Sequence, residues 1–434
     1  MNSTKIIGTR IKKIAGSKLA KVFGLTTVST LVKIITSFIS VKVVAVIIGP
    51  AGIALLGQLN NFSAMIMTLA TGGIGSGVVK YTSEYKNQQS KLRLYLSTAL
   101  MLTLVFSGLC GVVLILFAGF FSKLILLNIQ YTFVFRIFGF TIVLYALNNL
   151  LIAFLNGFQE YKKFVLVAIS TSIAGLVISV LLVWFFNIEG ALVSAVTFQS
   201  VVFFVTVFFV LKSSWFTKKN LSLRFSKPVA KKYFTYSLMA LTSAATVPVG
   251  QLIIRGHIIS RLSIESGGWW EAMNRLSGLS LLLITSSFGV YYLPRFSELI
   301  DKKALANEIK TAFKIIVPLL LVMFSAMFIL REFIITLIFS KAFLPIKQLF
   351  IWQICGDFFK ICSWLLAYVL VAKARIKIFI ATEIFFSVSF VALAFLLLHN
   401  GILGVVQAYL INYFFYFLFM AFWLIRYLKE DKKY

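Results

Sequence analysis

Acidic side chains are scarce in this sequence, which has 13 Asp and Glu against 42 Lys and Arg among its 434 residues. Only three are aspartates, and they lie far apart at Asp301, Asp357 and Asp431. The two histidines are also far apart, and the three cysteines lack the spacing of a disulfide or a zinc site. A paired-aspartate metal site, a Ser/His/Asp set and a phosphate-binding glycine loop are therefore unsupported. We predict no metal, no cofactor and no enzyme.

Long apolar segments dominate the rest of the chain. Hydrophobic residues make up 60% of it and charged residues only 13%. The apolar residues form blocks of roughly 18–28 residues, which cross a bilayer as helices, and we predict an all-α polytopic membrane protein with about 12 transmembrane helices. No short apolar segment with a cleavage site begins the chain, so the first span is expected to remain in the mature protein. The spans are expected at residues 22–48, 53–79, 95–120, 132–157, 164–187, 190–211, 233–255, 268–294, 315–336, 348–372, 378–398 and 402–425.

The basic residues are distributed unevenly between the loops that join these spans. One set of alternate loops, together with both termini, holds 31 of the 42 basic residues, and the other set holds only four. The positive-inside rule then places both termini in the cytoplasm. The net charge of +29 is attributed to contact with anionic lipid headgroups, and no nucleic-acid partner is expected. Residues 1–21 are expected to form either an amphipathic helix on the membrane surface or a disordered basic tail.

Matching segments recur at an offset of 211–214 residues, which indicates an internal duplication. Lys42 aligns with Arg255, Gly57 with Glu271, and Gly190 with Gly401. An even number of spans in each half gives both halves the same orientation, so we expect two pseudo-symmetric six-helix lobes around a central cavity. The expected divisions are a basic N-terminal segment at 1–21, an N-terminal lobe at 22–211, a cytoplasmic linker at 212–232, a C-terminal lobe at 233–425 and a tail at 426–434.

Glycine and proline interrupt the apolar segments at several places. Both residues free backbone groups that neighbouring helices or water must satisfy. Such positions are either hinges for alternating access or points of close helix packing through small residues. The hinge candidates are Gly72, Gly73, Gly75, Pro248 and Gly250.

Charged residues inside the predicted spans are mostly basic. A charge at the bilayer centre costs roughly 2.5–3.5 kcal/mol on insertion scales, so it persists only beside a wet cavity or paired with another charge. A cationic membrane interior favours a pathway for a polar, anionic cargo, and therefore transport. The basic residues are Lys33, Lys42, Arg136, Arg255, Arg275, Arg331 and Lys360, and the acidic residues at similar depth are Glu271, Asp357 and Glu383.

Short segments spread over nearly the whole chain resemble the Wzx-type flippases of the multidrug/oligosaccharidyl-lipid/polysaccharide exporter superfamily, above all the enterobacterial common-antigen and O-antigen subgroup. No single motif is diagnostic, and their order and spacing carry the resemblance. The segments are STLVKI at 29–34, GPAG at 49–52, VKY at 79–81, SLMAL at 237–241, IIR at 253–255, YLP at 292–294, WQICGD at 352–357, AKA at 372–374 and QAY at 407–409.

This resemblance implies a flippase that moves undecaprenyl-diphosphate-linked oligosaccharide units from the cytoplasmic to the periplasmic leaflet of the bacterial inner membrane by alternating access. The implied cargo belongs to O-antigen, enterobacterial common antigen or a related surface polysaccharide. The implied partners are this lipid, the bilayer and the polymerase and chain-length machinery of the same pathway. The implied fold is two six-helix lobes facing a central cavity.

The cargo's diphosphate needs a transient counter-charge, because its polar head cannot enter hydrocarbon without a large desolvation cost. Lys33, Lys42 and Arg255 are the leading candidates, since ammonium and guanidinium groups bind phosphate well. Lys42 and Arg255 alternatively extend toward the outer headgroups. Arg275 and Lys360 complete the set of candidates for the anionic headgroup.

Two pairs of opposite charges have helical spacing. Glu271 and Arg275 lie four residues apart, and Asp357 and Lys360 lie three apart, so each pair shares one helix face. Each pair is either a structural ion pair or a switch in which the anionic headgroup competes for the cation and frees the carboxylate. Arg136 and Glu383 are isolated in their spans and are candidates to pair with these sets.

Two other functions compete with this interpretation. A cation-coupled multidrug exporter of the same superfamily typically relies on membrane carboxylates, and none lies deep in the first six spans. A membrane enzyme of the same pathway needs catalytic groups outside the lipid, and the predicted outer loops have about twelve residues or fewer. Aromatic residues such as Trp270 and Trp364 either stack on sugars or pack at the membrane interface.

Overall fold

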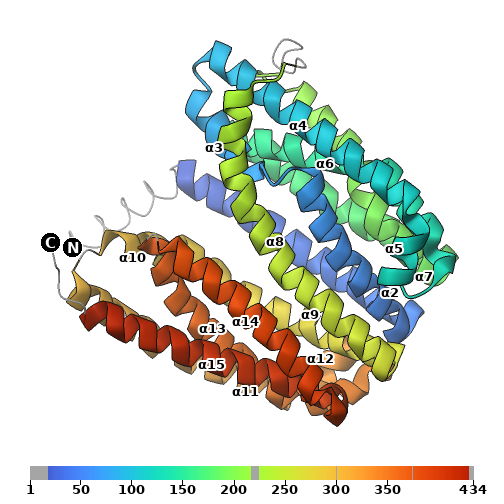
Figure 1. The fold of residues 1–434 in the computed structure, drawn as a ribbon, viewed down its shortest axis with the longest axis vertical. Coiled ribbons are helices and arrows are strands. Elements are labelled where there is room, and N and C mark those ends of the chain that lie inside the picture. The colour runs from blue at the N-terminus through green and yellow to red at the C-terminus, as the bar shows by residue number, and fades with distance from the viewer. Residues whose placement is uncertain (1–17, 217–223, 300, 374, 430–434) are drawn as a thin grey trace, which may run out of the picture. The chain divides into compact units, whose positions relative to one another are not determined.

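The computed structural model describes residues 18–216, 224–299, 301–373 and 375–429. Most of the basic segment predicted at 1–21, part of the linker at 212–232 and the end of the tail at 426–434 lie outside these residues. The described part is helical and contains no strand (Figure 1). The chain divides into two compact units, unit 1 with Met1–Ile47 and Phe62–Ala245 and unit 2 with Ile48–Asn61 and Thr246–Tyr434.

Unit 1 is built mainly from the helices that follow the first hydrophobic segment. α6 packs against both α4 and α7, and α3 packs against α4 and α6. Its elements are most of α2 (Lys18–Ala70), α3 (Gly75–Tyr85), α4 (Gln89–Leu116), α5 (Ala118–Ile125), the 3₁₀ turn η1 (Ile129–Tyr131), α6 (Thr132–Gly157), α7 (Tyr161–Leu211) and the first part of α8 (Lys227–Arg261).

Unit 2 contains the remaining helices, in which α13 packs against α9 and α15, and α14 packs against α15 (Figure 1). Its elements are the Ile48–Asn61 part of α2, the end of α8, α9 (Ile264–Ser287), the π turn η2 (Phe288–Tyr292), α10 (Leu293–Glu298), α11 (Lys302–Ile329), α12 (Arg331–Ile338), the 3₁₀ segment η3 (Lys341–Leu349), α13 (Phe350–Ala372), α14 (Ile376–Leu397), the turn η4 (Leu398–Asn400) and α15 (Gly401–Lys429).

The helices have the length and surface of membrane spans. Seven helical segments in the described part are long and apolar enough to cross a bilayer. Large apolar side chains such as Val322 and Ile329 are 70% and 76% exposed, which suits contact with lipid tails. The predicted all-α polytopic membrane fold is confirmed, and the number twelve stays a prediction.

Two long helices contain the breaks that the span boundaries predicted. α2 has a non-helical residue at Gly49, with φ 62°, next to Pro50, and α7 has one at Asn187, with φ 49°. The expected span at 53–79 is interrupted instead of continuous. Gly72 and Gly73, both with φ 65°, end α2 and turn the chain before α3 begins at Gly75. Glycine favours this left-handed conformation because it has no Cβ.

The other proposed hinge residues lie inside helices. Pro248 is in the middle of α8. A Cβ added at Gly250 would lie 3.5 Å from Val391 Cγ2, which is an ordinary van der Waals contact, so no close packing requires glycine there. A hinge role for the glycine and proline positions stays a prediction.

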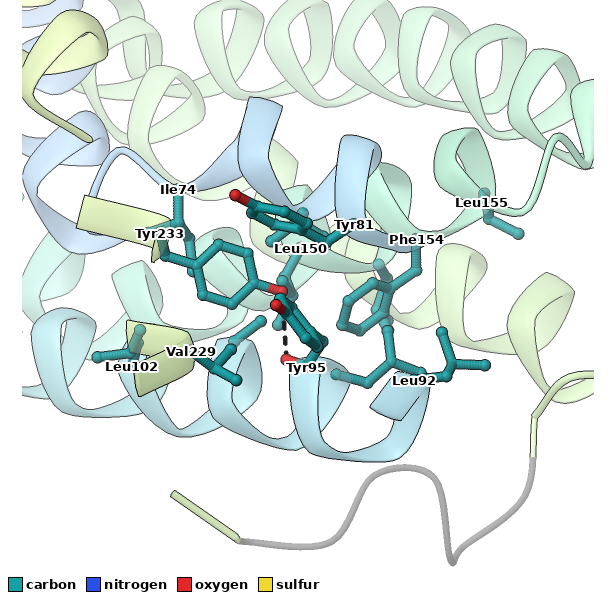
Figure 2. Close-up of a cluster of buried hydrophobic side chains, with 14 of the residues drawn as sticks. Ile74, Tyr81, Leu92, Tyr95, Leu102, Leu150, Phe154, Leu155, Val229 and Tyr233 are labelled. Atoms are coloured by element: carbon teal, nitrogen blue, oxygen red, sulfur yellow. Dashed lines mark hydrogen bonds between the residues drawn. The ribbon is translucent and has the colours of Figure 1, made fainter. Parts of the chain in front are cut away.

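A buried aromatic cluster lies inside unit 1 (Figure 2). Tyr81, Tyr95 and Tyr233 come from α3, α4 and α8, and the hydroxyl of Tyr233 donates to the backbone oxygen of Tyr95 at 3.3 Å. At its edge, Lys232 Nζ donates to the hydroxyl of Tyr95 at 3.1 Å. This hydrogen bond raises the pKa of Lys232 above its ordinary value. The cluster ties the start of α8 to α3 and α4.

α4 and α6 touch through a pair of glycines. A Cβ at Gly111 would lie 2.6 Å from the carbonyl oxygen of Gly139, and one at Gly139 would lie 2.8 Å from that of Gly111. We therefore expect Gly111→Val to force the helices apart and to lower stability by about 1–3 kcal/mol. Thermal unfolding in detergent measures this change. Gly108→Ala on the same helix is the control, because nothing lies within 4 Å of its Cβ. An equal loss in both variants would contradict close packing as the cause.

Candidate functional site

A buried charge network lies in unit 2 where α8 and α9 meet the Ile48–Asn61 segment of α2. Arg255 is fully buried and forms an ion pair with Glu271. The other carboxylate oxygen of Glu271 accepts from Arg275 Nε at 2.8 Å, which is the predicted (i, i+4) contact. Arg255 Nη1 donates to Gln58 Oε1 at 3.2 Å. The Arg255 guanidinium also lies over the ring of Trp270, 5.3 Å from its centroid.

Glycine makes the close approach of α2 to this network possible. A Cβ at Gly57 would lie 2.7 Å from Glu271 Cδ, and one at Gly268 would collide with the backbone oxygen of Pro50. Gln58 also donates to the backbone oxygen of Leu252, at 3.4 Å. The glycines of both helices therefore allow one carboxylate to reach two arginines at once.

Asp357 on α13 is satisfied by donors from three helices. Its Oδ1 atom accepts from Ser277 Oγ at 2.6 Å, from the Tyr409 hydroxyl at 2.7 Å and from Gln353 Nε2 at 3.3 Å. Asp357 is 2% exposed. These contacts make it a structural acceptor at the junction of α9, α13 and α15.

Lys360 does not form the ion pair with Asp357 that the spacing predicted. Its ammonium instead lies 4.8–5.3 Å from the ring centroids of Trp364, Tyr409 and Tyr413, a distance typical of cation–π contact. Three neutral donors bind Asp357 Oδ1, and the ammonium of Lys360 lies instead among Trp364, one turn further along α13, and two tyrosines of α15.

Lys360 lines a cavity of about 270 Å³ that lies entirely within unit 2. Glu383 on α14 also lines it, and Glu383 Oε1 accepts from the Tyr416 hydroxyl at 3.4 Å. Two buried polar atoms of lining residues, Asn274 Nδ2 and Asn412 Oδ1, have no hydrogen-bond partner. The cavity therefore combines two opposite charges and two amide side chains with aromatic rings.

The opposite side of α13 borders an apolar cavity of about 540 Å³ against α11. Spacing explains the two sides, since positions three or four residues apart share a helix face. The apolar side carries Ile351, Ile354, Cys355, Phe358 and Phe359. The polar side carries Gln353, Asp357, Lys360 and Trp364.

The other candidate site residues, Lys33, Lys42 and Arg136, lie in unit 1. Lys33 is exposed on α2 and Lys42 is half-buried on the same helix. Arg136 is exposed on α6 and forms no ion pair with a described residue, so the predicted pairing with Glu383 or the other sets is not seen. Among the described residues, no group of three or more His, Cys, Asp or Glu could hold a metal ion.

Sequence reasoning missed several residues that this region brings together. Gln58 is one, because its partner Arg255 lies 197 residues away. The others are on α15, where Tyr409, Asn412, Tyr413 and Tyr416 follow a spacing of three, one and three and so share one face. This spacing of polar and aromatic residues inside an apolar helix was a signal that could have found them.

Comparisons with known proteins agree with this architecture. Residues 19–300 match the family described as "Polysaccharide biosynthesis protein". The "Lipid III flippase" proteins of Escherichia coli (strain K12) and Shigella flexneri are each 30% identical over 400 residues, covering 92% of this chain and 96% of the relative.

Solved structures share the fold at lower sequence identity. An inward-facing multidrug resistance MATE family transporter of the MOP superfamily has a TM-score of 0.74 at 17% identity and covers 92% of this chain and 96% of its own. The lipid II flippase MurJ, in an inward closed conformation, has a TM-score of 0.69 at 16% identity, and the match covers 94% of this chain and 87% of the MurJ chain. The predicted relationship is confirmed: this chain is a multi-pass membrane protein that belongs to the polysaccharide biosynthesis protein family, to which it aligns over most of its length.

Proposed function

We propose that the protein is a flippase that translocates undecaprenyl-diphosphate-linked oligosaccharide units from the cytoplasmic to the periplasmic leaflet of the bacterial inner membrane by alternating access. The observation that carries the proposal is the 30% identity to the Lipid III flippases along nearly the whole chain. The two units, each with charged side chains inside long apolar helices, support it. The protein acts as a transporter and not as an enzyme.

The charge distribution supports a phosphorylated cargo. Lys33 is an exposed cation in an apolar helix, and it forms no ion pair with a described residue. It therefore suits a first contact with the diphosphate, with Lys42 nearby on α2. Arg255 and Arg275 would join only after Glu271 releases them, which makes Glu271 the proposed switch.

The proposed topology has both termini in the cytoplasm, as the basic loops indicate. Two lobes at about 22–211 and 233–425, joined by 212–232, would move about a central pathway, with the glycine and proline positions as hinges. The polymerase and chain-length machinery of the pathway would receive the cargo outside. Asp357, Arg136 and Glu383 remain candidates for coupling.

The multidrug exporter alternative is supported by the shared fold alone, since the MATE transporter is 17% identical. A cationic drug would meet Lys360 in the cavity of unit 2 and the exposed Lys33 of unit 1. Both cations repel such a substrate. The flippase therefore accounts better for the charges.

The function is tested in two ways. Deletion in the host is expected to accumulate one lipid-linked oligosaccharide on the cytoplasmic leaflet, identified by mass spectrometry. The purified full chain in proteoliposomes is expected to move undecaprenyl-diphosphate-linked oligosaccharide between leaflets. Failure of the full chain to move any diphosphate-linked glycolipid, together with an unchanged lipid pool in the deletion strain, would overturn the proposal.

Lys33→Gln is expected to slow this translocation about tenfold or more, because a charge-assisted contact to the diphosphate is lost. Lys33→Arg should retain most of the rate, since the charge is kept. The measurement is the initial rate in proteoliposomes of equal protein content. Lys123→Gln, which removes an exposed cation from α5, is the control and should leave the rate unchanged. A normal rate in Lys33→Gln would remove this residue from the pathway.

A further inference from the structure

The cavity in unit 2 has the chemistry of a ligand site and not of a packing defect. It is bordered by α8, α9, α13, α14 and α15, and all its lining residues belong to the one unit. Seven of them are aromatic, including Trp270, Trp364 and Tyr413. Small-molecule sites are typically aromatic with a few convergent polar groups, and this cavity fits that description.

Two lining residues of the cavity have a buried amide atom without a hydrogen-bond partner. Asn412 is 2% exposed, and its Oδ1 atom accepts no hydrogen bond. Asn274 Nδ2, from the facing helix α9, donates none. Buried polar atoms are nearly always paired, because leaving one unpaired is unfavourable. The amides of Asn274 and Asn412 therefore make the lining polar, with hydrogen-bonding capacity that the described protein does not use.

The charges of the cavity indicate the net charge of that ligand. Lys360 contributes a positive charge and Glu383 a negative one, and neither forms a salt bridge with a described residue. The two charges offset each other, so neither an anionic diphosphate nor a free cation gains a net attraction from the pair. An apolar tail would leave Asn274 and Asn412 unsatisfied. An uncharged molecule rich in hydroxyl groups meets all three conditions.

We propose that this cavity binds one uncharged sugar ring of the cargo, an inference that rests on the proposed function and names its sugar-reading site. The apolar face of the ring packs against the aromatic side chains. Ring hydroxyls donate to Glu383 and accept from Lys360, and the amide side chains of Asn274 and Asn412 line the same cavity. A volume of about 270 Å³ equals that of about nine water molecules, so it holds a single ring and not a whole oligosaccharide.

The test compares two probes on the purified full chain in detergent, undecaprenyl diphosphate with one uncharged hexose and undecaprenyl diphosphate without sugar. Microscale thermophoresis gives the Kd of each. The unsubstituted protein should bind the hexose-bearing lipid more tightly. Asn412→Leu should weaken that binding about three- to tenfold and leave the sugar-free lipid unaffected. Lys360→Met, the second variant, should weaken the same probe selectively.

Asn412→Leu also separates a ligand role from a structural one. Because Asn412 Oδ1 has no partner, leucine should leave the melting temperature unchanged or raise it. The matched control is Asn148→Leu in unit 1, where Asn148 Nδ2 donates to Gln199 at 3.0 Å and Oδ1 accepts from Thr206 at 2.6 Å. That variant should lower the melting temperature and keep the preference for the hexose-bearing lipid.

The outcomes distinguish the two proposals. If the unsubstituted protein binds neither lipid, the proposed function fails. If it binds both equally, or if Asn412→Leu and Lys360→Met weaken both probes to the same degree, the sugar site is overturned and the flippase function stands. Selective loss of the hexose-bearing probe supports the site.

Discussion

Glu271→Gln is expected to destabilise the protein by about 3–5 kcal/mol, because it leaves the charge of Arg255 buried and uncompensated. Arg255 is fully buried, and its ion pair in the described structure is with Glu271. The same substitution removes the charge that holds Arg275. The glutamine is similar in size, so the space opposite Gly57 stays filled. Chemical or thermal unfolding in detergent measures the change.

A double variant and a surface control make the cause clear. Arg255→Met with Glu271→Gln should recover much of the lost stability, since the uncompensated charge is gone. Glu332→Gln removes an ion pair with Lys347 in which the side chains of Glu332 and Lys347 are 58% and 42% exposed, and it should leave the free energy of unfolding nearly unchanged. Equal losses from Glu271→Gln and Glu332→Gln would show that the buried network contributes no more than a surface pair.

Asp357→Leu is the second substitution with a large expected effect. It leaves the hydroxyls of Ser277 and Tyr409 and the amide of Gln353 without their acceptor. Each buried donor without a partner costs about 1–3 kcal/mol, so the loss should reach several kcal/mol. The unfolding midpoint in detergent and the yield of folded protein report it.

Asp357→Asn is the matched control, because its amide oxygen can accept in place of Oδ1. We expect it to retain most of the stability that Asp357→Leu loses. If stability survives both changes but translocation in proteoliposomes is lost in both, Asp357 acts in coupling and not as a structural acceptor.

The helices were predictable from the sequence because apolar runs of this length cross a bilayer as helices. The boundary between the spans expected at 22–48 and 53–79 correctly predicted the break at Gly49 in the first long helix. Gly72 and Gly73 were expected inside a continuous span at 53–79, and they instead follow the end of the helix, while their role as a hinge stays a prediction. A run of glycines permits both outcomes, and tertiary packing against Ser237 selects one, since a Cβ at Gly73 would lie 3.1 Å from Ser237 Cα.

The internal repeat is visible in the turn geometry, with a shift from the predicted alignment. Asn187 and Gly401 both have positive φ. Three residues after each lies a glycine, Gly190 or Gly404, at which an added Cβ would collide with a backbone carbonyl oxygen of the preceding helical segment. The sequence alignment paired Gly190 with Gly401 instead. Nearby glycines offered two offsets, and only backbone conformation distinguishes them.

Contacts within one helix were easier to predict than contacts between helices. The spacing of Glu271 and Arg275 correctly predicted their ion pair. The same reasoning failed for Asp357 and Lys360, because helical spacing does not reveal what Ser277 and Tyr409 offer from other helices. The partner of Arg255 was missed for the same reason.

α13 has an apolar side and a polar side, and this arrangement restricts insertions within the helix. Each added residue rotates the following part of a helix by about 100°, since a turn takes 3.6 residues. One insertion between Gln353 and Asp357 would therefore carry Lys360 out of its aromatic surroundings and into the position now held by Ile361, which is fully buried. We therefore expect α13 to tolerate the exchange of single apolar side chains better than any change in its length.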